Sequence, residues 1–114
     1  MAKSYQEFLA NIGPMQAEVI AYLDQQFTTI EGVARKMRYS IPFYDYNSWI
    51  CYLNPLKSSG VELCFLEGIK MTESFPILDL KGRKMVSGLS IDVNDDLPID
   101  LILDMINHAI SLNN

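Results

Sequence analysis

Histidine and cysteine are scarce in this chain, which has one His and two Cys. Compact metal sites built from soft donors need three or four Cys or His side chains at short spacings. Cys51 and Cys64 lie 13 residues apart with only His108 to assist them. This spacing argues against such a site and predicts two buried, free thiols. The single His also leaves the Ser and Cys side chains without a base relay, so the sequence predicts a protein that is not an enzyme.

Long apolar runs, glycine and proline are also few. Nowhere do 18 apolar residues follow one another, and the first residues lack the apolar run of a signal peptide. These absences argue against a membrane protein and predict a cytoplasmic one. Five Pro and six Gly in 114 residues leave no low-complexity tract, so residues 1–114 are expected to form a single domain.

Positive charge is limited as well, with nine Lys and Arg against fourteen Asp and Glu. A nucleic-acid partner needs cations that neutralise phosphates, so the net charge of −5 argues against one. Residues 1–31 hold four acids and one Lys, residues 35–84 hold five acids and eight bases, and residues 85–114 hold five acids and no base. The ends of the chain are therefore acidic and its middle is mildly basic.

The hydrophobic pattern predicts helices at both ends of the chain and strands between them. Helices are expected at 5–12 and 14–27, and another is expected to start within 94–98 and end near 112. Strands are expected at 33–38, 49–53, 61–66 and 83–92, with a strand edge or bend at 39–44. Strands grouped between helices favour an α+β fold. We expect two layers, with an antiparallel sheet of about five strands and the N-terminal and C-terminal helices on one face.

The helix expected at 14–27 has apolar residues at helical spacing, which predicts the face that it buries. That stripe consists of Met15, Val19, Tyr22, Leu23 and Phe27. The residues expected to face outward are Gln16, Glu18, Asp24, Gln25 and Gln26.

The segment 39–66 contains the only Trp and both Cys, and it reads as a strand leading into a β-hairpin. A register that places Asn54 opposite Val61 assigns Ile50, Tyr52, Val61, Leu63 and Phe65 to the face under the helices. The opposite face is then also apolar apart from Glu62, which is unusual for a sheet face open to water. It consists of Trp49, Cys51, Leu53, Cys64 and Leu66. Either other segments of the chain cover this face, or it binds a second subunit, another protein or a ligand.

Acidic residues around the last helix form a candidate metal surface. Asp100, Asp104 and His108 are spaced four residues apart and stack along one helix face, and Asp95 and Asp96 precede them. Carboxylate oxygens suit hard cations. The alternative is a solvated helix face, because acids at a helix N-terminus also serve capping and dipole interactions.

Several short motifs together resemble the YdhG-like family of small bacterial domains. They are Tyr39-x-Ile41-Pro42-x-Tyr44, Trp49-x-Cys51-Tyr52, Val61-x-Leu63-x-Phe65-x-x-Gly68, Gly82-Arg83-Lys84, and Ile99-Asp100 with Ala109 in the final helix. The resemblance implies a two-layer α+β fold similar to type III secretion chaperones. One branch of the family is described as a frataxin-like intracellular iron chaperone, which implies iron as a cofactor.

Two hypotheses follow from the sequence. The first is a non-enzymatic YdhG-like domain that binds or delivers iron weakly, through its acidic surface. The second is an interaction module that binds a protein partner or forms a homodimer through the apolar second face of the sheet.

Overall fold

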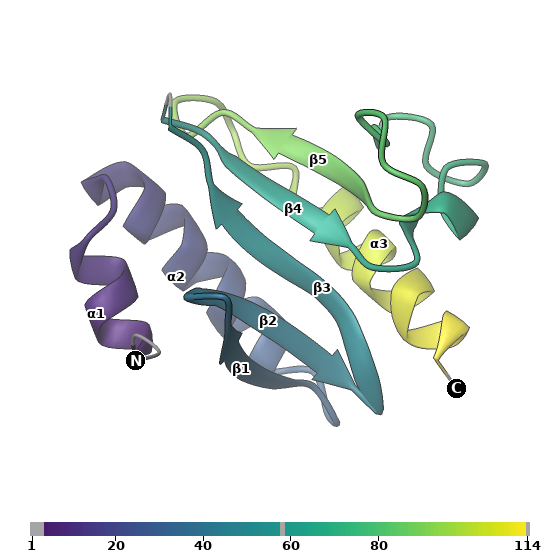
Figure 1. Cartoon of the computed structure of the whole chain (residues 1–114), viewed down its shortest axis with the longest axis horizontal. Helices are drawn as coiled ribbons and strands as arrows, with labels where there is room; N and C mark the ends of the chain where they lie inside the picture. The colour runs from purple at the N-terminus through teal and green to yellow at the C-terminus, as the bar shows by residue number, and fades with distance from the viewer. Residues whose placement is uncertain (1–3, 58, 114) are drawn as a thin grey trace.

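The computed structural model describes residues 4–57 and 59–113 and shows an α+β domain (Figure 1). Two helices begin the chain, five strands follow, and one helix ends it. The helices are α1 (Tyr5–Ala10), α2 (Pro14–Thr28) and α3 (Ile99–Leu112), with a short 3-10 helix, η1 (Gly68–Lys70). The strands are β1 (Ala34–Arg38), β2 (Ile41–Tyr46), β3 (Ser48–Pro55), β4 (Val61–Phe65) and β5 (Ser87–Ile91).

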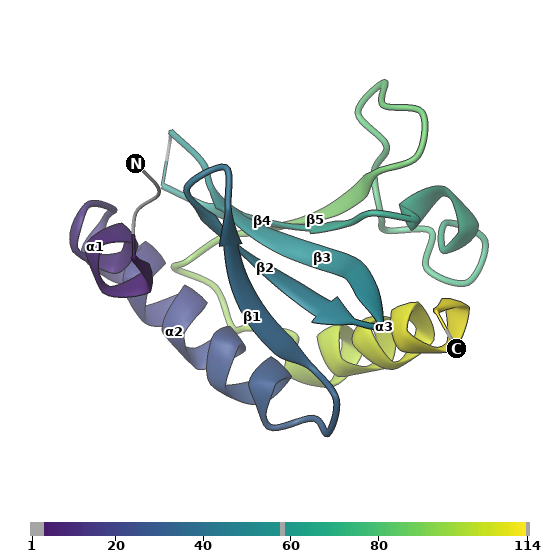
Figure 2. The same cartoon turned by 60° about the horizontal axis from the view of Figure 1, so that its bottom comes forward.

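The five strands form one antiparallel sheet in the order β1-β2-β3-β4-β5. The helices α2 and α3 lie on the same side of the sheet (Figure 2), and the hydrophobic core fills the space between the layers. The predicted fold class, with its five-stranded antiparallel sheet and terminal helices, is therefore confirmed. None of the helices in the described ranges has the length and apolarity needed to cross a lipid bilayer.

The predicted register of the β3–β4 hairpin is wrong by one residue. Val61 pairs with Pro55 rather than Asn54, and Cys51 pairs with Phe65. The loop is shorter than expected because Gln16 of α2 donates hydrogen bonds to the carbonyls of Leu56 and Gly60, both at 2.8 Å. This long-range contact closes the loop after Pro55 and sets the pairing of the two strands.

The shift changes which side chains share a face of the sheet. Cys51 and Leu53 are fully buried beneath the helices, whereas Tyr52, Glu62 and Cys64 lie on the opposite face. The predicted second face of Trp49, Cys51, Leu53, Cys64 and Leu66 is therefore not one surface. A β-bulge separates the Tyr44–Cys51 and Asp45–Trp49 pairs, so Trp49 lies on the same face as Tyr52.

The buried face of α2 also differs from the prediction. Gln16 and Asp24 are buried against the sheet, although both were expected to face outward. Met15 and Tyr22, which were expected to be buried, are 47% and 43% exposed. The helix is rotated from its purely apolar orientation because Gln16 and Asp24 make hydrogen bonds to β-strand and loop groups that satisfy them when buried.

Candidate functional site

The face of the sheet opposite the helices carries a cluster that we call the aromatic–arginine patch. It consists of Arg38, Tyr39, Phe43, Trp49 and Tyr52. The ring of Phe43 is stacked on Tyr52 at 4.9 Å and meets the edge of Trp49 at 5.4 Å, both between ring centroids. These distances are typical of favourable aromatic pairs, so the patch is a packed surface rather than a loose set of side chains.

Two local features of the backbone build this patch. A two-residue turn joins Arg38 to Ile41, and its residues Tyr39 and Ser40 have φ angles of 53° and 65°. This left-handed geometry is that of a tight hairpin turn, and it places Tyr39 at 5.9 Å from Phe43, between ring centroids. The β-bulge in β3 supplies the second feature, because it brings Trp49 onto the face that carries Phe43 and Tyr52.

Arg38 is fixed in place within the patch. Its two terminal nitrogens each donate to a carboxylate oxygen of Asp45 at 2.7 Å, and its guanidinium carbon lies 4.3 Å from the centre of the Trp49 ring. The fork geometry of the pair restricts the guanidinium plane, and the cation–π contact orients Trp49 in turn. The hydrogen bonds from Arg38 hold the pKa of Asp45 below its usual value despite its partial burial.

The patch is nevertheless open to solvent at two of its aromatic residues. Tyr39 is 81% exposed and Trp49 is 41% exposed, while Phe43 beneath them is buried. A large aromatic surface in water is unfavourable for an isolated domain, and such a surface marks a contact site when its neighbours are ordered. The half of the sheet face around β1 to β3 is therefore a candidate binding surface.

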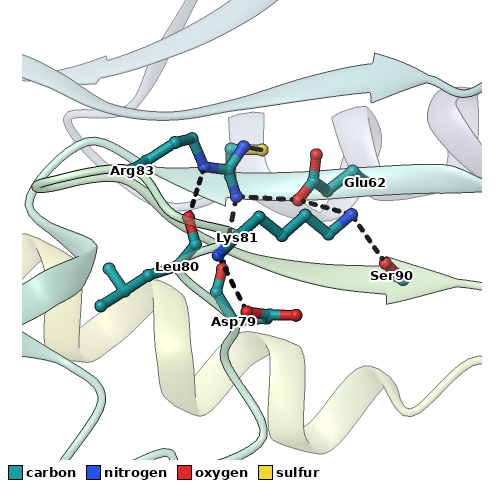
Figure 3. A network of polar contacts seen from close by, with 7 residues as sticks. Glu62, Asp79, Leu80, Lys81, Arg83 and Ser90 are labelled. Carbon is teal, nitrogen blue, oxygen red and sulfur yellow. Dashed lines mark hydrogen bonds and ion pairs between the residues drawn. The ribbon is translucent and has the colours of Figure 1, made fainter.

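The other half of the same face is covered by the chain itself (Figure 3). The segment 79–83 pairs with the edge of β5 through two hydrogen bonds between Asp79 and Gly88, each 2.9 Å long. From this segment Arg83 and Lys81 reach Glu62 on β4, with nitrogen–oxygen distances of 3.0 and 3.3 Å. Glu62 is only 4% exposed as a result.

Arg83 holds this cover in place through several contacts. It donates to the carbonyls of Leu80 at 3.0 Å and Asp79 at 3.3 Å, and it lies 3.9 Å from the sulfur of Cys64. Cys64 is fully buried below it. The absence of a side chain at Gly88 provides the space for the Glu62 carboxylate, because an added Cβ at Gly88 would overlap it.

The environment of the titratable groups on this face favours structure over reactivity. Burial and a hydrogen bond to Cys64 raise the pKa of the Tyr52 hydroxyl to about 12. Burial raises the pKa of the Cys64 thiol to about 11, and it also raises the pKa of Cys51 on the other face. Both cysteines are free and buried, as predicted. Thiols with raised pKa values carry little thiolate at neutral pH and are poor nucleophiles.

The ion pairs on this face predict a loss of stability in acid. Burial disfavours the charged carboxylate of Glu62, but hydrogen bonds from Arg83 and Cys64 outweigh burial, so its pKa lies below the ordinary 4.5. The pKa of Asp45 likewise lies below its ordinary 3.8. Because the unfolded chain binds these protons first as pH falls, the free energy of unfolding should decrease below about pH 4.5. Urea unfolding at about pH 7 and about pH 3 would measure this decrease.

The matched variant for this measurement is the double substitution Glu62→Gln with Asp45→Asn, which removes both carboxylates. We expect this double variant to show a smaller difference between the two pH values than the wild type. Asp104→Asn removes an exposed carboxyl that belongs to neither ion pair. It should show the same difference in the free energy of unfolding between the two pH values as the wild type. An unchanged pH dependence in the double variant would contradict the prediction.

The predicted metal residues lie apart from this face, along the helical layer. Asp95 and Asp96 precede α3, and Asp100 and Asp104 lie on it, all four exposed. His108 is half-buried and meets the ring of Phe75 edge-on at 5.5 Å between centroids. Within residues 4–57 and 59–113, no group of three or more His, Cys, Asp or Glu side chains is placed to hold a metal ion. The structure therefore does not gather the five predicted metal residues into one site, and iron binding stays a prediction.

Of the five predicted interface residues, Trp49 and Cys64 lie on the face opposite the helices, whereas Cys51 and Leu53 are buried in the core beneath the helices. Arg38, Tyr39, Phe43 and Tyr52 were missed. The signal that could have found Tyr39 is weak, because the tight turn has Tyr-Ser where such turns usually have Asn-Gly. The sequence pattern did not predict the pairing of β1 with β2, which places Arg38 and Phe43 side by side on one face of the sheet.

A comparison of the chain with family models, curated proteins and solved structures finds no match. The YdhG-like resemblance therefore stays a prediction that depends on the quoted motifs.

Proposed function

We propose that this domain is a non-catalytic interaction module that binds a protein partner through the aromatic–arginine patch. One observation carries the proposal. The segment 79–83 covers Glu62 and Cys64 on half of the open sheet face, whereas the other half leaves Trp49 and Tyr39 exposed. The uncovered half combines Trp, Tyr and Arg, the residue types enriched at the energetic centres of protein interfaces.

The order within the patch supports this role. Arg38 is held by Asp45 and stacked on Trp49 before any partner arrives, so little side-chain freedom remains to be lost on binding. Phe43 is buried and packs against both exposed rings from below. A partner that covers Trp49 and Tyr39 therefore gains apolar burial at low entropic cost.

The side-chain chemistry on this face also favours binding over catalysis. The carboxylates of Asp45 and Glu62 are engaged in ion pairs, and the Cys64 thiol is buried. These groups fix the geometry of the face, and none of them presents an activated nucleophile to solvent.

Trp49 makes the proposal directly measurable, because it is the only Trp in the chain. A random-peptide phage library panned against the folded domain should yield peptides that shift the Trp49 emission to shorter wavelength, since binding removes the indole from water. Tyr39→Ser should weaken the binding of these peptides about tenfold or more, as expected for an interface centre.

Tyr22→Ser is the matched control, because Tyr22 has nearly the same exposed fraction as Trp49 but lies on α2. It should leave peptide binding unchanged. Trp49→Ser should abolish binding measured by fluorescence anisotropy of the labelled peptide. Equal binding by wild type, Tyr39→Ser and Trp49→Ser would overturn the proposal. Light scattering tests for self-association: a dimer lost in Trp49→Ser would identify the partner as a second copy.

A further inference from the structure

The helix α2 carries a second apolar stripe that does not face the sheet. The row of α2 that packs on the sheet is fully buried and consists of Ile20, Leu23 and Phe27. The second stripe lies beside this row and is exposed or half-buried; it consists of Met15, Val19 and Tyr22. A surface helix that packs only on a sheet needs one apolar stripe. The second stripe of α2 is therefore available to another contact.

This stripe forms one wall of a groove of about 710 Å³ on the helical layer. The other wall comes from Val93, Leu97 and Ile99, which lead into α3. A neighbouring hollow of about 420 Å³ shares Met15 and Val93 with the groove and continues it toward Lys57 in the β3–β4 loop. The groove thus has apolar side chains on both walls, and it is far from the aromatic–arginine patch, which lies across the sheet.

The surroundings of the groove are acidic. Glu18 lines it, and the exposed Asp95 and Asp96 are the two residues between the lining positions Asn94 and Leu97. The chain has no Lys or Arg in 4–31 or in 85–113, the two ranges that contain the helices α1, α2 and α3. Lys57 is the only cation among the residues that line the two hollows, and it lies at one end.

We propose that this groove binds a short basic amphipathic helix of a protein partner. The apolar face of that helix would cover Met15, Val19 and Tyr22, and its cations would lie against Glu18, Asp95 and Asp96. The lining residues of α2 run from Met15 to Gln25, a rise of about 15 Å, which matches roughly three helical turns.

Charge favours a basic helix over a second copy of the chain as the occupant of the groove. Each helix of the domain, α1, α2 and α3, is acidic and contains no Lys or Arg. Docking one of them into the groove of another copy would place like charges together. A basic helix instead has complementary charge and a faster encounter rate. This inference does not depend on the proposed role of the patch, since the two surfaces share no residue.

The experiment uses two synthetic helical peptides of about 14 residues, one with Leu on one face and Lys elsewhere, and one with Glu in place of each Lys. Fluorescence anisotropy of each labelled peptide is measured against the intact domain. We expect the Lys peptide to bind saturably and the Glu peptide to bind at least about tenfold more weakly. Tyr22→Ser and the pair Glu18→Lys with Asp96→Lys should each weaken the Lys peptide about tenfold.

Two control variants exclude general attraction to an acidic protein and a role of the patch. Asp104→Lys reverses an exposed charge on α3 outside the groove lining, and Trp49→Ser alters the patch; both should bind the Lys peptide like the wild type. Circular dichroism checks that each variant is folded. Binding that is unaffected by Tyr22→Ser, or reduced equally by Asp104→Lys, would overturn the inference. A dimer that Tyr22→Ser abolishes would also overturn it, because the occupant would then be a second copy.

Discussion

Replacing Asp24 by Ala should lower the free energy of unfolding by about 3 kcal/mol, because it leaves a buried hydrogen-bond network without its acceptor. The Asp24 carboxylate accepts from the Tyr44 hydroxyl and from Arg35, each at 2.8 Å. Arg35 in turn lies 3.7 Å from the centre of the Tyr5 ring. The network joins α1, α2, β1 and β2, so its loss removes polar contacts that hold α1 and α2 against the sheet edge.

The environment of the tyrosines shows how strongly this network is desolvated. Burial and the nearby Asp24 charge raise the pKa of Tyr44 far above its usual value and that of Tyr5 to about 12. Tyr44 is fully buried, whereas the Arg35 side chain keeps about a third of its surface in water. The cost of Asp24→Ala should therefore lie at the lower end of the range for broken buried ion pairs, since Arg35 can be partly rehydrated.

Urea unfolding of three variants measures this effect. Tyr44→Phe removes one hydrogen bond but leaves the Arg35 pair, so it should cost about 1 kcal/mol. Glu31→Ala removes an exposed acid just beyond α2 and should change stability by less than about 0.5 kcal/mol. A cost for Asp24→Ala no larger than that for Glu31→Ala would show that the network does not stabilise the fold.

Gly68→Ala should be comparably destabilising, by about 3 kcal/mol, for a steric reason. A Cβ on Gly68 would overlap the backbone nitrogen and the hydroxyl of Ser87 and would lie 2.7 Å from its Cβ. Ser87 begins β5 and is fully buried. Backbone cannot move aside as a flexible side chain can, so η1 or β5 would have to shift and the β4–β5 pairing would weaken.

Gly82→Ala is the matched control for this prediction. An added Cβ at Gly82 meets no atom within 4 Å, but its φ of 77° is unfavourable for Ala. Its cost should be only about 1 kcal/mol, from backbone conformation alone. Thermal unfolding of both variants separates the two causes. Equal costs would mean that the close approach of η1 to β5 is not important for stability.

The surfaces on the two sides of the sheet give the domain two separate candidate contacts. The aromatic–arginine patch holds its one cation, Arg38, in an ion pair with Asp45, and the groove on the helical layer has apolar walls and acidic edges. The uneven charge along the chain has its structural counterpart here, since the mildly basic middle supplies four of the five strands, and the acidic ends supply the helices α1, α2 and α3 together with β5. Variants of Trp49 and Tyr22 test the two contacts independently.

The sequence by itself determined the fold class and most of the element positions. The helical spacing in 99–112 and the pairing of Ser4 with Glu7 at the start of α1 are local patterns, and each is present in the structure. Local propensity and hydrophobic period agree in these segments, so neighbouring residues are sufficient to specify them.

Only the tertiary structure decided which side chains share a surface. Gln16 and Asp24 read as solvent-facing residues of α2, yet loop carbonyls and the Tyr44 hydroxyl satisfy their polar groups and allow them to be buried. The Gln16 contact also sets the hairpin register, and the β-bulge at Ile50 turns Trp49 toward the open face. A shift of one residue moves a strand's side chains to the other face of a sheet. The groove therefore depends on long-range hydrogen bonds of α2, and the patch depends on strand pairing and a β-bulge; the hydrophobic pattern of the sequence specifies neither.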